Sequence, residues 1–367
     1  MHKNSDSHEL RPLTGIRGIA AIAVVFFHFS SSWYPLMPAL KCLDSIAARG
    51  WLGVDLFFIL SGLILSYVYT SGDKKFGIHE YKKFLWFRLA RIYPNHIATL
   101  GFLVLLVVLT NFIGIKISGK YPIWCLPFEV TLTQGWPFIP SGIWNYPSWS
   151  ISAEWFAYLC IFPISWRILR CRLGAMGFLF LGYFFLALWL GCFRLEIFKN
   201  HGALLQVSCE FMAGSLFFGA IREAPALARV LQKYGTLFFI VILAIAGFLP
   251  LSAGFASYLI ILVFPLLLIS LTSETSFFAK SVSTRVMLWL GKISYAMYMS
   301  HAIVQKLIKV FLPSEHYAHA TLEIRALVLF TNMALILLGA VLLYYLVEIP
   351  ARNLMRRMEI AWMTAPK

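Results

Sequence analysis

The chain has 367 residues, of which 60% are apolar and 13% are charged, and its formal net charge is +15. Soluble proteins carry about 25% charged residues, so this composition excludes an ordinary soluble domain, in agreement with a mean hydropathy of +0.77. The apolar residues form blocks close to the roughly 20 helical residues that cross a bilayer. We therefore predict an all-α integral membrane protein, a bundle of about ten transmembrane helices in a single domain over residues 1–367.

The predicted membrane helices follow one another along the whole chain, and we expect no soluble domain before, between or after them. In chain order they are Thr14–Trp33, Trp51–Thr70, His96–Ile115, Trp149–Trp166, Leu173–Cys192, Ala203–Ile221, Thr236–Pro250, Gly254–Thr272, Val286–Val310 and Ala326–Val347. Only the short stretch "LPLSAG" separates the seventh from the eighth. The ninth is a candidate for a broken helix.

The basic residues predict how the bundle is oriented. With ten crossings and a cytoplasmic N-terminus, most of the 31 lysine and arginine residues face the cytoplasm, as the positive-inside rule requires. We therefore predict cytoplasmic tails at residues 1–12 and 348–367. The same rule explains most of the net charge, so no nucleic-acid partner is needed to account for it. The cysteines and histidines lack the spacing of a metal site, and we expect no metal.

Arg17 and His28 are polar residues within the first apolar block, "RGIAAIAVVFFHFS". Eleven residues are close to three helical turns, so the two side chains lie on nearly one face, about 16 Å apart along the helix axis. Arg17 is either a charge that sets topology or a functional group. His28 is either an interhelical hydrogen-bond partner or a functional group. Ionisable residues inside a membrane are functional candidates by default, which favours function for His28.

Three other predicted helices carry polar residues that we expect in the outer half of the membrane, at the depth of His28. They are Asp55 in the second helix, Ser150 and Glu154 one turn apart in the fourth, and His301 in the ninth. A structural hydrogen bond would explain any one of them. Their shared depth favours one common polar pocket.

An amphipathic segment, "YKKFLWFRLARIYPNH", lies between the second and third predicted helices, on the cytoplasmic side. Arg88 and Arg91 are three residues apart and therefore project together from a helix. A basic interfacial helix of this kind commonly binds anionic lipid headgroups. The alternative is a phosphate clamp, because paired guanidinium groups match phosphate oxygens.

Six pieces of the sequence, taken in order, resemble the acyltransferase-3 family of membrane acyltransferases. They are "RPLTGIRGIAAIAVVFFH", "WLGVDLFFILSGLILS", "FRLARIYP", "PSWSISAEWFAY", "ISYAMYMSHAIV" and "VEIPAR". Each piece alone is a weak pattern, but their order and membrane depths make the resemblance specific. It covers nearly the whole chain. Some family members add a C-terminal SGNH hydrolase-like domain, which we expect this chain to lack.

The resemblance implies an O-acyltransferase that moves an acyl group, commonly acetyl from acetyl-CoA, to a hydroxyl of a surface glycan or a lipid-linked sugar. It implies acyl-CoA, the sugar acceptor and membrane lipids as partners, and a bacterial cytoplasmic (inner) membrane as the location. Lipopolysaccharide and exopolysaccharide are typical acceptors of the family.

The resemblance and the residues together predict one mechanism. Arg88 and Arg91 would bind the phosphates of acyl-CoA, and the pantetheine arm would pass Arg17 to reach His28. Neutral His28 would act as general base on the acceptor hydroxyl. Glu154 or Asp55 would orient the imidazole, and Ser150 would position Glu154. His301 would either bind the acceptor or contribute only to the packing.

Two alternatives of other classes stay open. One is a membrane scaffold whose polar core is structural. The other is a polytopic transporter. It would use the same carboxylates and histidines as an intramembrane proton relay. Inverted repeats with matching broken helices would favour it, and the sequence shows no such repeat.

Overall fold

The computed structural model describes residues 10–70, 77–114, 119–137, 139–140, 142–171, 173–194, 202–249 and 254–364. These residues form helices and loops, with an isolated β-bridge between Lys120 and Ile143. The predicted all-α class is confirmed for this part of the chain. Residues 1–9 and 365–367 of the two predicted tails, and residues 250–253 of the "LPLSAG" stretch, lie outside the described residues.

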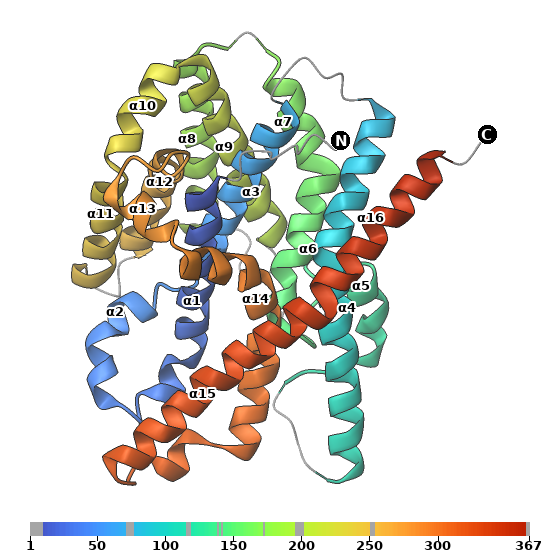
Figure 1. The fold of residues 1–367 in the computed structure, drawn as a ribbon, viewed down its shortest axis with the longest axis vertical. Helices are drawn as coiled ribbons and strands as arrows, with labels where there is room; N and C mark the ends of the chain where they lie inside the picture. Colours follow the sequence, from blue (N-terminus) through green and yellow to red (C-terminus); the bar gives the residue numbers. More distant parts are fainter. Residues whose placement is uncertain are drawn as a thin grey trace.

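The long helices form one bundle (Figure 1). They are α1 (Arg11–Trp33), α3 (Leu52–Thr70), α4 (Ile78–Phe112), α6 (Trp149–Phe156) with α7 (Phe162–Ile168), α8 (Ala175–Arg194), α9 (Ala203–Glu223), α10 (Pro225–Lys233), α11 (Gly235–Phe248), α12 (Gly254–Ser270), α14 (Arg285–Phe311), α15 (Leu322–Leu343) and α16 (Ile349–Thr364). The short helices α2 (Asp44–Ala47), α5 (Leu126–Val130) and α13 (Phe277–Val282) lie in the connections.

Each of the ten predicted segments coincides with helix, but the boundaries differ in three places. The amphipathic segment before the third predicted segment is continuous with it, because α4 runs unbroken over both. The ninth segment is not broken, because α14 is one helix of 27 residues. The predicted C-terminal tail is largely helical, since α15 continues through a π-helical turn at Tyr344–Glu348 into α16.

Length and composition support fewer membrane crossings than ten. Among the described residues, six helices are long and apolar enough to cross a membrane: α1, α3, α4, α8, α9 and the continuous stretch Leu322–Met358. The pair α10 and α11, bent by 61°, adds a seventh if it is one span. The count of ten crossings is therefore not confirmed by this criterion. The prediction of a membrane protein is confirmed, because large apolar side chains such as Phe112, Phe180 and Phe330 are well exposed on these helices.

Glycines let α1 pack closely against α13 and α14. A Cβ atom added at Gly15 would lie 1.8 Å from the carbonyl oxygen of Val282, and one at Gly291 would lie 1.9 Å from that of Thr14. Such distances are far inside van der Waals contact, so only glycine fits at either position. The small residues of the first block therefore bring α1 against its neighbours, as in close-packed membrane helices.

Glycines also let α3 pack closely against α9. A Cβ atom at Gly62 would lie 2.0 Å from the carbonyl oxygen of Phe211, and one at Gly214 would lie 1.9 Å from that of Ile59. Because the two backbones approach this closely, the polar side chains on α3 are held at fixed positions relative to α9.

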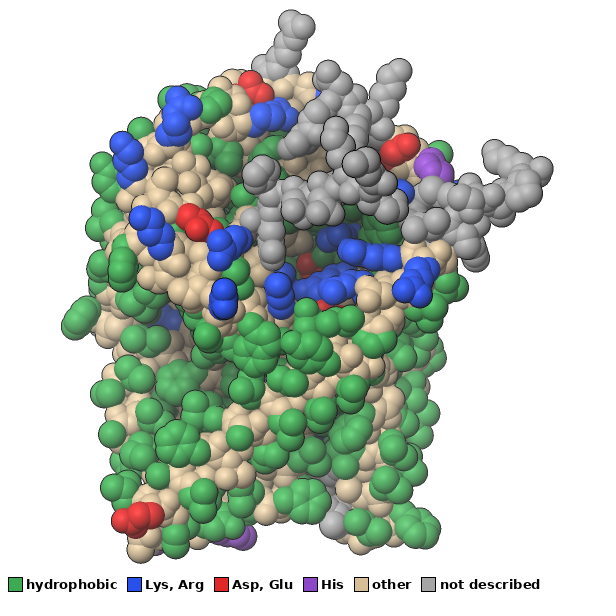
Figure 2. Space-filling model, viewed as in Figure 1, with side chains coloured by type: hydrophobic (Ala, Val, Ile, Leu, Met, Phe, Trp, Pro, Cys, Tyr) green, Lys and Arg blue, Asp and Glu red, His purple; other side chains and the backbone are tan. Residues whose placement is uncertain are grey.

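The two ends of the bundle differ in charge. The beginning of α1 and the end of α16 lie toward the same end, uppermost in Figure 1, which we call the upper end. Lysine and arginine side chains gather in the upper half of the face in Figure 2, whereas apolar side chains cover most of the lower half. The basic side chains also surround a hollow near this end.

Candidate active site

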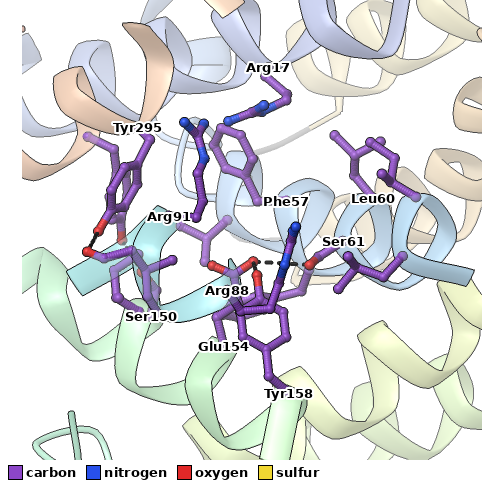
Figure 3. A pocket seen from close by; sticks show the side chains of 17 residues that line it. Arg17, Phe57, Leu60, Ser61, Arg88, Arg91, Ser150, Glu154, Tyr158 and Tyr295 are labelled. Carbon is purple, nitrogen blue, oxygen red and sulfur yellow. Dashed lines mark hydrogen bonds between the residues drawn. The ribbon is translucent and has the colours of Figure 1, made fainter. Parts of the chain in front are cut away.

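An interior cavity near the upper end holds the three arginines singled out in the sequence. It has a volume of about 150 Å³ and is lined by Arg17 of α1, by Arg88 and Arg91 of α4 and by Glu154 of α6. We call it the arginine cavity (Figure 3). Arg17 and Arg88, which are 71 positions apart in the chain, both line this cavity because α1 and α4 border it.

Glu154 is held in the arginine cavity by two hydroxyl groups. The hydroxyl of Ser61, on α3, donates to Glu154 Oε1 at 3.0 Å, and the hydroxyl of Tyr158 donates to the same oxygen. In Figure 3 dashed lines join the Glu154 carboxylate to these two hydroxyls, and the Arg88 side chain crosses in this view between the carboxylate and Ser61. Its charge also acts on Arg17. Glu154 therefore offsets part of the positive charge of the cavity.

Ser150 also lines the arginine cavity but does not position Glu154 as expected. Its hydroxyl bonds to the hydroxyl of Tyr298, at 2.8 Å, and to the carbonyl of Pro147, at 3.1 Å. Ser150 thus ties the start of α6 to α14, while Ser61 and Tyr158 hold the glutamate.

Arg91 already has an anionic partner inside the protein. Its guanidinium forms an ion pair with Glu348, a fully buried residue of the turn between α15 and α16. The amide of Asn95 donates to the other oxygen of Glu348 at 2.7 Å. The Arg91 guanidinium also lies 5.6 Å from the ring centroid of Tyr295. Arg91 is therefore fixed in place by α14 and by the C-terminal part of the chain.

Arg17 and Arg88 lack such a match. The structure pairs neither of them with a carboxylate among the described residues, and Arg88 Nε is buried without a hydrogen-bond partner. The guanidiniums of Arg17 and Arg91 lie side by side in Figure 3 and repel each other. Buried charges of one sign are costly unless an opposite charge is close. The arginine cavity is therefore suited to an anion.

A second, wider cavity of about 760 Å³ contains His28 and is called the histidine cavity. Its walls include four tryptophans: Trp51, Trp136, Trp149 and Trp189. Its polar side chains include Asp55, Glu129, Gln134, Tyr146 and Gln206. Aromatic walls with a few polar groups are typical of small-molecule sites. Val54 and Tyr298 line both cavities, so the two meet at these side chains.

The His28 ring lies among aromatic rings, and no carboxylate of the described residues forms a hydrogen bond or ion pair with it. Its centroid is 4.9 Å from that of Tyr146 and 5.1 Å from that of His301. Neither Asp55 nor Glu154 bonds to it, contrary to the expected orienting role. Asp55 Oδ1 instead accepts from the Gln206 amide at 3.0 Å, and Glu154 lies in the other cavity. Within the described part of the chain, the proton relay of the alternative transporter thus lacks a hydrogen bond or ion pair between His28 and a carboxylate.

The structure divides the polar residues that the sequence placed at one depth. His28 and Asp55 line the histidine cavity, whereas Ser150 and Glu154 line the arginine cavity. The reason is visible in Figure 1: the segment with α5 folds back beside α4, so α6 begins well above the lower ends of α4 and α14. Its residues therefore lie deeper in the bundle than a helix starting at the membrane surface would place them.

Three buried glutamates were missed in the sequence, although each is a lone acid within an apolar stretch. Glu348 pairs with Arg91, Glu210 of α9 lies beside Asp55, and Glu129 of α5 accepts from the Ser148 hydroxyl at 3.2 Å. Burial raises the pKa of Glu129, which lies outside the membrane-spanning helices, to about 8. Within the described ranges, no group of three or more His, Cys, Asp or Glu is arranged to bind a metal ion.

The profile of the acyltransferase-3 family, described as an acyltransferase domain, matches residues 12–347. A Staphylococcus aureus protein with the provisional name O-acetyltransferase is 24% identical over 93% of this chain and 57% of its own length. Acyltransferase MdmB of Streptomyces mycarofaciens is 32% identical over 44% of this chain and 40% of its own. Peptidoglycan O-acetyltransferase OatA of Listeria monocytogenes is 23% identical over 79% of this chain and 48% of its own.

The chain thus spans about half the length of the curated relatives it matches. No solved structure matches it. The family match includes every residue that lines the arginine and histidine cavities. The chain belongs to the acyltransferase-3 family of membrane acyltransferases.

Proposed function

We propose that this acyltransferase takes its acyl group from acyl-CoA and transfers it, as acetyl in the simplest case, to a hydroxyl of a cell-surface glycan or a lipid-linked sugar. One observation carries the proposal: an arginine-lined cavity and a tryptophan-lined cavity of different chemistry meet at Val54 and Tyr298. A donor with phosphates suits the first, and a sugar suits the second.

The donor would enter from the upper end, where the basic side chains lie. Arg17 and Arg88 are the available phosphate ligands, because guanidinium groups bind phosphate in a bidentate fashion. Arg91 is held by Glu348 and would add its charge from a fixed position. The pantetheine arm is long and flexible, so the thioester can pass Val54 and Tyr298 while the phosphates stay among the arginines.

The acceptor would enter the histidine cavity. Tryptophan rings stack on the apolar faces of sugars, and the amides and carboxylates between them can bind hydroxyl groups. The volume of about 760 Å³ is of the size of a small-ligand site. The relatives named as O-acetyltransferases support a hydroxyl as the group that is acylated.

His28 would supply the base. Its neutral ring removes the proton of the acceptor hydroxyl as the oxygen attacks the thioester carbonyl. The tetrahedral intermediate then collapses, the carbon–sulfur bond breaks, and the thiolate takes the proton from the His28 imidazolium. The products are an ester and a free thiol, and no proton is gained or lost.

The membrane arrangement is part of the proposal. The upper end faces the cytoplasm of a bacterial cell, where acyl-CoA is made, and both termini lie on that side after ten crossings of the inner membrane. The clustering of basic residues at this end agrees with the positive-inside rule.

The experiment that tests the function is an ester analysis of surface glycans. A strain without the gene should lose O-acyl esters, the gene should restore them, and a His28→Ala gene expressed at the same level should not. A strain without the gene that keeps every O-acyl ester would contradict the assignment.

A further inference from the structure

Helix α16 adds two arginines to the upper end of the bundle. Arg352 and Arg356 are four residues apart, so they project from the same face of the helix. The helix packs along α4, and the indole of Trp86 donates to the carbonyl of Met355 at 2.8 Å. This bond fixes the part of α16 that carries Arg356 beside the part of α4 that carries Arg88.

Both α16 arginines belong to the same charge cluster as the arginine cavity. The charge of Arg356 is affected by those of Arg352, Arg88 and Arg91, and its guanidinium lies 5.7 Å from the ring centroid of Phe87. Arg352 shares Glu348 with Arg91, at 3.5 Å. The positive charge around the proposed donor site therefore extends outward onto α16, and Figure 2 shows basic side chains around the hollow at this end.

The positive charge of this cluster is not balanced within the described residues. Five guanidinium groups take part: Arg17, Arg88, Arg91, Arg352 and Arg356. The carboxylates that act on them are Glu154 and Glu348. Each guanidinium is repelled by its neighbours, and Arg88 Nε has no partner. A ligand with several negative charges would remove this repulsion.

We propose that Arg352 and Arg356 form the outer part of the donor site and bind the 3′-phosphate of a coenzyme A donor. This inference rests on the proposed function. The order of groups along the donor supports it, because the thiol must reach Val54 and Tyr298, the diphosphate follows the pantetheine arm, and the 3′-phosphate on the ribose is farther still. Arg352 and Arg356 do not line the arginine cavity, and Arg356 is exposed, so they lie farther out than the cavity arginines.

A phosphate of the same charge is present in anionic lipid headgroups, so the test must separate the two sources. The chain offers a matched control in Arg357, which is exposed on α16 and is not part of the cluster. A headgroup at the membrane surface responds to the total charge of the helix. A 3′-phosphate site responds to the position of the charge.

The experiment measures the binding of coenzyme A and of dephospho-CoA, which lacks the 3′-phosphate, to the full chain in phosphatidylcholine nanodiscs. Arg356→Gln should weaken coenzyme A binding about five- to tenfold and change dephospho-CoA binding less than about twofold. Arg357→Gln, which removes the same charge one residue away, should leave both affinities unchanged. Nanodiscs with added phosphatidylglycerol give the lipid arm.

Three outcomes would overturn the inference. They are equal losses for Arg356→Gln and Arg357→Gln, equal losses for the two ligands, and an Arg356→Gln effect that appears only with phosphatidylglycerol. All three leave the proposed function intact, provided that the unmodified protein binds coenzyme A. Failure of the unmodified protein to bind either ligand would instead contradict the acyl-CoA donor itself.

Discussion

The imidazole rings of His28 and His301 are stacked, with centroids 5.1 Å apart and planes inclined by 27°. His301 is fully buried, and its Nδ1–H donates to the carbonyl of Tyr298 at 2.6 Å, since a carbonyl can only accept. His301 Nε2 is then the acceptor, and the Tyr146 hydroxyl lies 3.3 Å from it. His28 is the ring that lines the cavity. His301 is thus fixed by its neighbours and stacks against the His28 ring.

The first prediction concerns His28 as the base. His28→Ala should lower acyl transfer about 100-fold or more, because general-base catalysis contributes factors of about 10²–10⁴. Coenzyme A binding should persist, since the phosphates would lie in the other cavity. The measurement is esterification of acceptor by the purified protein, with thermal unfolding as the folding control. Transfer at the normal rate would remove His28 from the mechanism.

The second prediction separates Arg88 from a lipid anchor. Arg88→Lys keeps the charge but loses the bidentate geometry, so acyl-CoA binding should weaken by about 1–3 kcal/mol. A lipid anchor would tolerate the change. Calorimetry on the purified protein gives the affinity. Unchanged binding in both Arg88→Lys and Arg88→Ala would leave Arg88 as a lipid contact.

The paired residue Arg91 should behave differently from Arg88. Glu348→Gln leaves the Arg91 charge buried without its partner, and breaking a buried ion pair in this way costs about 3–5 kcal/mol. We therefore expect a clear drop in the thermal unfolding midpoint for Glu348→Gln. A midpoint equal to that of the unmodified protein would mean that the ion pair does not hold α16 in place.

The fourth prediction tests the junction of the two cavities. Val54 is 7% exposed and lines both of them, so Val54→Phe should narrow the passage of the thioester. Acyl transfer should then fall while coenzyme A binding stays, whereas Val54→Ala should preserve transfer. Because a larger core residue can cost about 1–3 kcal/mol, unfolding midpoints are compared first. Full transfer by a folded Val54→Phe protein would place the passage elsewhere.

The fifth prediction concerns the contact of α3 with α9. Gly214→Ala would place a Cβ 1.9 Å from the carbonyl oxygen of Ile59, and we expect a loss of about 3 kcal/mol because the backbones must separate. Gly101→Ala is the control, since nothing lies within 4 Å of its added Cβ and alanine is the better helix former by about 1 kcal/mol. Thermal unfolding in detergent should give shifts of opposite sign. A stable Gly214→Ala protein would contradict the close approach.

The orientation of the bundle is open to cysteine labelling. Lys120→Cys and Glu315→Cys should react from outside the cell, and Arg170→Cys should not, since the positive-inside rule puts Arg170 in the cytoplasm. Glu315 is chosen over its neighbour Ser314 because Glu315 is exposed and Ser314 is buried. Lys75, a further cytoplasmic marker, lies outside the described residues. The exposed Cys42, Cys160 and Cys171 must be replaced first.

The helical class, the approximate boundaries of the segments and the close packing of α1 could be predicted from sequence because they depend on local properties. An apolar block of about 20 residues prefers a helix in lipid whatever its neighbours are. Gly15 and Gly18 likewise indicate a helix face without bulky side chains, which allows a neighbouring helix to pack closely. The family could also be recognised, because its motifs are short and occur in order.

The grouping of side chains was decided by the tertiary structure. The sequence identified Arg17, His28, Glu154 and Arg88 as polar residues that are costly to bury. It predicted that Glu154 would lie beside His28 and that Arg88 and Arg91 would together bind phosphate, but the structure separates both pairs of roles. Depth was inferred from the assumption that each helix starts at the membrane surface, which α6 does not obey. Glu348 reaches Arg91 across 257 positions of sequence. Local patterns show which residues are expensive to bury, but their partners depend on contacts between distant segments, and only the folded bundle determines those.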